Sequence, residues 1–167
     1  MRTIPEKIIK MLSIEKKHLE IMFSIFTAES EAIVAFNLDV MKRVNEKKIY
    51  TMNRSRTIRD MKENLLFDIS EKLLGERKPI KIEFALGLIK KEETRREILD
   101  LIGDIDNLVS SVCRLAEKNQ KLINHALATI EGTVKSVAGT FKKNRGYNEF
   151  GKESPSVMTG AILAGRM

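Results

Sequence analysis

The chain has 167 residues, of which 32% are charged and only 5% aromatic, and it contains no Trp. This length suits one domain, and the composition is typical of long solvated helices with narrow apolar stripes. The single Cys113 excludes an internal disulfide, and no run approaches the roughly 20 apolar residues of a membrane-spanning helix. The N-terminus has charges every few residues and no apolar run of signal-peptide length, so we expect a cytoplasmic protein.

The net charge of +7 has two interpretations. A basic chain can bind nucleic acid or an anionic surface, or it can simply have a lysine-rich solvated surface. Acidic residues are interspersed in all the predicted helices, which favours the solvated surface. We therefore expect no nucleic-acid partner.

A first helix is predicted over residues 3–37. Thr3 and Glu6 have the spacing of a capping box, and Pro5 lies in the first turn, where its missing N–H costs little. An apolar stripe at helical spacing follows: Leu12, Leu19, Phe26, Ile33 and Val40, with Ile8, Met22 and Phe36 beside it.

The end of this helix is predicted at Asn37-Leu38-Asp39, which offers turn and N-cap chemistry. The first stripe fails shortly afterwards, because Lys47 and Arg54 fall on it. The polar run Asn53–Thr57 is a second candidate for the turn. The second helix is predicted over residues 39–74 and stops at Gly75. Its apolar positions are Val44, Ile49, Met52, Ile58, Met61, Leu65, Ile69 and Leu73.

Residues Ile80–Ile89 are apolar, and the sequence leaves open a short helix or an extended packing segment. A third long helix is predicted over residues 92–141, because two heptad stripes alternate by four and three residues. One stripe is Ile98, Ile105, Val112, Asn119, Ala126 and Thr133, and the other is Ile102, Val109, Ala116, Ile123, Ile130 and Val137. Asn119 is the polar position that can set the register of the helices at some cost in stability.

These elements predict an all-α fold, an elongated antiparallel three-helix bundle of coiled-coil type over residues 1–141. The third helix, at about 75 Å, is longer than the first two, at about 50 Å each. We therefore expect its C-terminal end to expose an apolar stripe, which usually marks a partner site. The residues of this predicted stripe are Ile123, Leu127, Ile130, Val134, Val137 and Phe141.

The remaining residues, 142–167, are predicted to form a flexible tail. Lys142-Lys143-Asn-Arg145 is basic and is followed by Tyr147 and Phe150, which is a weak pattern for single-stranded nucleic acid. The tail cannot bury enough surface to fold alone. It is either a frayed terminus or a segment that orders on a partner, with Val157, Ile162 and Leu163 as anchors.

No pattern of catalytic or metal-binding residues is complete in this sequence. Glu15 and His18 have the E-x-x-H spacing of di-iron bundles, but the only other histidine, His125, lacks the matching acid. Cys113 has no histidine near it in sequence, and the glycines form no phosphate-binding loop. We expect no enzyme activity, no metal and no cofactor.

The order of these elements resembles the FlgN-type flagellar export chaperones. The resemblance is carried by Glu29–Ile33, Asp39–Val44 and Glu46–Ile49 in the first hairpin, by Asn119–Leu127 in the third long helix, and by Tyr147–Gly151 in the tail. It implies a non-enzymatic chaperone in the cytoplasm that binds hook-associated proteins of the hook–filament junction. It also implies delivery of these clients to the membrane protein of the type III export gate.

The stripe and the tail together define the predicted client-binding set. Its members are Ile123, Leu127, Ile130, Val134, Val137, Phe141, Tyr147, Phe150, Ile162 and Leu163. Tyr147 is the candidate for docking on the client or on the gate. The alternative interpretation is a structural or signalling bundle that self-associates as a homodimer through the same stripe.

Overall fold

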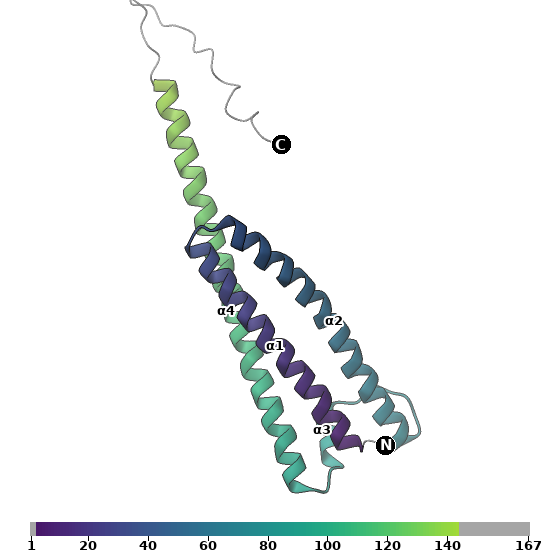
Figure 1. Cartoon of the computed structure of the whole chain (residues 1–167). Helices are drawn as coiled ribbons and strands as arrows, with labels where there is room; N and C mark the ends of the chain where they lie inside the picture. Colours follow the sequence, from purple (N-terminus) through teal and green to yellow (C-terminus); the bar gives the residue numbers. More distant parts are fainter. Residues whose placement is uncertain (1–2, 144–167) are drawn as a thin grey trace, which may run out of the picture. The chain divides into compact units, whose positions relative to one another are not determined.

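The computed structural model describes residues 3–143, with side chains described up to residue 139. Four helices make up this part of the chain: α1 (Ile4–Val34), α2 (Leu38–Leu74), α3 (Ile82–Gly87) and α4 (Glu92–Lys143) (Figure 1). The predicted all-α helical bundle is confirmed. Two units divide the chain, Met1–Ile123 and Asn124–Met167, and the helix packing described next lies in the first.

The start of α1 has the capping chemistry that the sequence predicts. The backbone N–H of Thr3 donates to Oε2 of Glu6 at 2.9 Å, and Pro5 occupies the first turn. The side chain of Glu6 thereby satisfies a backbone donor that has no partner within the helix. The helix then continues without interruption to Val34.

A three-residue turn separates α1 from α2, and Phe36 has an unusual conformation in it. The backbone N–H of Phe36 donates to the carbonyl of Ile33, and that of Asn37 donates to the carbonyl of Ala32. This is the hydrogen-bond pattern of a Schellman motif, in which the residue at the position of Phe36 is usually Gly. Phe36 has φ +50°, in the left-handed region that is unfavourable for a residue with a side chain.

Asn37 ends the turn by capping α2, since its Oδ1 accepts from the backbone N–H of Val40 at 3.1 Å. The turn therefore lies at residues 35–37, and α1 ends three residues before the predicted position. The other candidate turn, Asn53–Thr57, lies inside α2 and is helical. At its far end α2 stops at Gly75, which has φ +74°.

Helices α1 and α2 pack antiparallel, and every seventh residue of α1 contacts a residue of α2. Some of these contacts are apolar and others are ion pairs. Each step of seven along α1 is matched by a step of seven backwards along α2. The successive pairs are Ile8 with Ile69 in the core, Glu15 with Lys62 at 2.8 Å, Met22 with Ser55 at 3.5 Å, and Glu29 with Lys48. The two ion pairs alternate with the other pairs and hold the two helices in one register.

Helix α4 runs parallel to α1 within the first unit, so the three long helices follow an up-down-up order (Figure 1). Lys16 of α1 pairs with Asp104 of α4 at 2.7 Å. Further along both helices, the Asn119 side chain of α4 donates a hydrogen bond to the carbonyl of Phe26 in α1. Four successive positions of one heptad stripe of α4 are buried: Ile98, Ile105, Val112 and Asn119. In the other stripe Ile102 and Ala116 are half-buried and Val109 is exposed, so the first stripe forms most of the contact with the other helices.

The short helix α3 covers the end of the bundle where α1 begins. Ala85 and Leu86 are buried in one apolar cluster with residues of all three long helices. The other buried members of this cluster are Ile8, Leu12, Ile69, Ile98 and Ile105. The open question about Ile80–Ile89 is thus resolved in favour of a short helix.

A buried polar network joins α1, α2 and α4. Nδ2 of Asn119 donates to the carbonyl of Phe26 at 2.7 Å and to Oε2 of Glu29 at 2.9 Å. The other carboxylate oxygen of Glu29 accepts from Nζ of Lys48. The network favours the helix register that brings Nδ2 of Asn119 to Phe26 and Glu29, as predicted for a polar residue in a heptad stripe, although Oδ1 of Asn119 is buried without a hydrogen-bond partner among the described residues.

Candidate functional site

An apolar stripe on α4 is exposed in the second unit, where side chains are described from Asn124 to Gly139. Leu127, Ile130, Val134 and Val137 follow one another at intervals of three, four and three residues, so they share one helix face. Each of these four side chains is between 50% and 60% exposed. Four large aliphatic side chains on one helix face form a surface that a partner can cover.

The two threonine hydroxyls on this stretch of α4 bond to the helix itself. Oγ1 of Thr129 donates to the carbonyl of His125 at 3.0 Å, and Oγ1 of Thr133 donates to the carbonyl of Thr129 at 2.9 Å. These bonds to the preceding turn leave neither threonine hydroxyl proton in need of a partner on binding. A Cβ added at Gly132 would meet nothing within 4 Å, so this position is open as well. Apolar contact is the main interaction that the stretch offers.

The other predicted client-binding residues differ in what the structure shows of them. Ile123 belongs to the first unit and is half-buried. Phe141 lies in α4, but its side chain is not among those described. The tail residues Tyr147, Phe150, Ile162 and Leu163 lie outside the described residues. The structure therefore brings together the four exposed residues from Leu127 to Val137.

The E-x-x-H pair of α1 takes part in helix contacts instead of a metal site. Glu15 pairs with Lys62, and Nε2 of the buried His18 lies 2.7 Å from Oγ of Ser55. Burial lowers the pKa of His18 from its ordinary 6.5, and the nearby guanidinium of Arg54 lowers it further. Within the described residues no group of three or more His, Cys, Asp or Glu side chains is placed to hold a metal ion.

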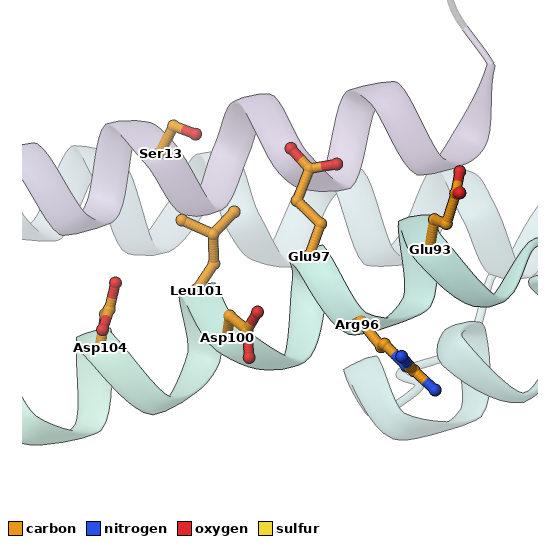
Figure 2. Close-up of a pocket in the computed structure, with 7 residues that line it drawn as sticks. All are labelled: Ser13, Glu93, Arg96, Glu97, Asp100, Leu101 and Asp104. Carbon is orange, nitrogen blue, oxygen red and sulfur yellow. The ribbon is translucent and has the colours of Figure 1, made fainter.

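An acidic depression between α1 and the first turns of α4 was missed by the sequence analysis. It has a volume of about 530 Å³ and is lined by Ser13, Glu93, Arg96, Glu97, Asp100, Leu101 and Asp104. Glu97 and Leu101 point toward α1, while Arg96 points away from it (Figure 2). The hydrogen bond and the charge of Asp104 raise the pKa of Lys16 at its edge. The signal in the sequence was the spacing of the four carboxylates, at 93, 97, 100 and 104, on one helix face.

None of the helices in residues 3–143 combines the length and the apolarity that a bilayer-spanning segment requires. A helical bundle whose longest helix presents an uncovered apolar stripe is suited to binding a partner segment by apolar contact. The fold thus defines the class, an all-α helical bundle whose longest helix has an exposed apolar stripe.

The family can be stated as well. A comparison with protein families matches residues 1–155 to the family described as FlgN protein. The chain belongs to the FlgN family, and its role is that of a chaperone in flagellum biogenesis. The resemblance of the sequence to the FlgN-type chaperones is thereby confirmed. Searches of the curated proteins and of the solved structures found no match.

Proposed function

We propose that this protein is a cytoplasmic export chaperone that binds flagellar hook-associated proteins through the α4 stripe and delivers them to the export gate. The observation that carries the proposal is the exposed row Leu127, Ile130, Val134 and Val137 in a member of the FlgN family. An amphipathic client helix would place its own apolar residues, at intervals of three and four, against this row.

The physical role of such a complex follows from burial. A client segment that has not yet assembled exposes apolar side chains, and covering them keeps the segment from aggregating before export. Fully burying one aliphatic side chain is worth about 1.5–3 kcal/mol, so four of them can support binding after the cost of ordering the client. Moderate affinity is useful here, because the gate must be able to release the client.

The first experiment is a calorimetric titration of the protein with a C-terminal peptide of a flagellar hook-associated protein. Saturable binding with a clearly negative heat-capacity change is expected, since apolar surface is buried. No heat at several temperatures, with a peptide shown to be soluble, would overturn the proposal.

A matched pair of variants locates the binding surface. Leu127→Asp places a charge on the stripe, whereas Ala128→Asp places the same charge on an exposed position away from it. Binding is expected to weaken at least tenfold for Leu127→Asp, because one anchor is lost and a carboxylate is desolvated, and to change little for Ala128→Asp. Equal affinities of the two variants would remove the stripe from the site.

The tail is proposed to contribute to client binding, with Tyr147 docking on the client or the gate. Deleting residues 142–167 should abolish client binding while leaving the helical circular dichroism largely intact. Unchanged client affinity would overturn the role of the tail.

Sedimentation of the isolated protein distinguishes the chaperone hypothesis from the alternative of a self-associating bundle. The proposal expects the stripe to be available for a client at working concentrations. A tight homodimer that is broken by Leu127→Asp would favour the alternative, in which the stripe serves self-association.

A further inference from the structure

A second open surface lies in the first unit, on the side of the α1–α2 pair. An open groove of about 720 Å³ runs between the two helices, and its walls include Ile21 and Ile25 of α1 and Tyr50 of α2. Ile21 is 45% exposed and Tyr50 is 69% exposed. The groove thus has an aliphatic floor with an aromatic ring at its rim.

The part of α2 that borders this groove has a net charge close to that of the whole protein. Residues 42–62 contain eight basic and two acidic residues, a net charge of +6 compared with +7 for the whole chain. Two of the eight, Lys48 and Lys62, pair with carboxylates of α1. The other six are exposed and form no ion pair among the described residues: Lys42, Arg43, Lys47, Arg54, Arg56 and Arg59.

The unpaired basic residues fall on two different sides of α2. Arg43, Lys47, Tyr50 and Arg54 are four, three and four residues apart, so they share the side on which Lys47 and Tyr50 line the groove. Arg56 lies two residues after Arg54, about 200° around the helix, and therefore on another side. A row of three cations consequently borders the apolar groove along its α2 edge.

These features select one class of occupant. An amphipathic helix can put aliphatic side chains on Ile21 and Ile25 while an acidic edge meets the cations of α2. A nucleic acid would satisfy the cations but would leave the aliphatic floor of Ile21 and Ile25 uncovered. The combination of an apolar floor with a basic edge along α2 fits a protein helix better than a polyanion.

We propose that the α1–α2 groove binds an acidic amphipathic helix of a partner protein, with its apolar face on Ile21, Ile25 and Tyr50 and its acidic edge along Arg43, Lys47 and Arg54. This site is separate from the α4 stripe, and it does not depend on the client-binding role proposed for that stripe. The chaperone would then have two surfaces with different chemistry, one apolar and one apolar with a basic edge.

The test uses two labelled synthetic helical peptides with the same leucines at intervals of three and four. One carries Glu along the edge of its apolar face, and the other carries Lys at the same positions. Binding is measured with the full-length protein at about 0.1 M salt, where charges within about 10 Å still interact. The Glu peptide is expected to bind saturably, and the Lys peptide is expected to bind at least tenfold more weakly.

Charge reversal then locates the site with a matched control. Arg43→Glu/Arg54→Glu reverses two charges beside the groove, and Arg56→Glu/Arg59→Glu reverses two charges away from it. The first variant should lose at least tenfold in affinity for the Glu peptide, while the second should lose much less. Leu127→Asp on the α4 stripe should leave this binding unchanged, which distinguishes the groove from the client surface.

Three results would overturn the proposal. These are the absence of saturable binding up to about 1 mM of the Glu peptide, equal losses for the two charge-reversal variants, and tighter binding of a single-stranded oligonucleotide that Arg43→Glu/Arg54→Glu abolishes. The second result would mean a general electrostatic attraction, and the third would mean a nucleic-acid site.

Discussion

Replacing Glu29 by Ala should destabilise the bundle more than replacing any other carboxylate of α1. Glu29 is buried, and its two carboxylate oxygens accept separately from Asn119 and Lys48. Removing it leaves a buried amide donor without its charged acceptor and an ammonium without its counter-ion. The Asn119 amide lies where water has little access, so its donor is not resolvated, whereas the Lys48 ammonium is partly exposed.

The magnitude follows from the two contacts. A hydrogen bond to a charged acceptor contributes about 1.5–3 kcal/mol. The Lys48 side chain keeps 23% of its exposure, so its ion pair lies between an exposed pair, worth about 0–1 kcal/mol, and a fully buried one, whose disruption costs about 3–5 kcal/mol. Together these terms predict a loss of about 2–4 kcal/mol in the free energy of unfolding for Glu29→Ala.

Urea unfolding followed by circular dichroism at 222 nm is the assay. Glu15→Ala is the matched control, because Glu15 also pairs with a lysine of α2, but in a more exposed place and without a bond to α4. It should cost about 1 kcal/mol or less. A cycle of Glu29→Ala, Lys48→Ala and the double variant should show a coupling of at least about 1 kcal/mol. If Glu29→Ala lowers the free energy of unfolding no more than Glu15→Ala does, or if the cycle is additive, the Glu29 network does not stabilise the bundle.

Two further predictions concern local features of the first unit. Phe36→Gly should stabilise the protein by about 1 kcal/mol in urea unfolding, because Phe36 is 63% exposed and its left-handed backbone conformation is unfavourable for any residue with a Cβ; a loss of stability would mean that the Phe36 ring contributes more than its backbone costs. The stability of the wild type should fall as the pH is lowered from 7 toward 5, because the lowered pKa of His18 means that the unfolded chain, with the ordinary value of 6.5, binds the proton more readily. His18→Gln should flatten this part of the pH profile, and a profile that is identical in the two proteins would contradict the account of His18.

The sequence pattern was sufficient to predict the helices, because their signals are local. The capping box at Thr3 and Glu6, the glycine stop at Gly75 and the heptads of α4 depend on residues within a few turns of one another. The predicted turn, Asn37–Asp39, lies two residues after the observed one at residues 35–37. The Schellman motif of this turn has Phe36 where Gly is usual, so no glycine marks its position in the sequence. The conformation of Ile80–Ile89 could not be predicted, because a helix of six residues is too short for a periodic signal.

The polar contacts in the core were harder to predict, although a signal existed. The stripe Ile8, Met22 and Phe36 is part of a heptad series that also contains Glu15 and Glu29. Carboxylates at the helix–helix contact require basic partners, but only the packing of α1 against α2 shows that these partners are Lys62 and Lys48. The sequence likewise does not show which side of α2 borders a groove.

The sequence by itself was therefore sufficient to predict the all-α class, the long helices and the apolar row on α4, because these follow from residue types at fixed spacings. Motifs at such spacings also carry the likeness to the FlgN family. The tertiary structure decided which rows are covered. Ile98, Ile105 and Val112 are buried, whereas Val109 in the second heptad stripe of the same helix is exposed, although both stripes are apolar there and both repeat every seven residues. Burial depends on which other segments lie against a helix face, and that is a property of the packed chain.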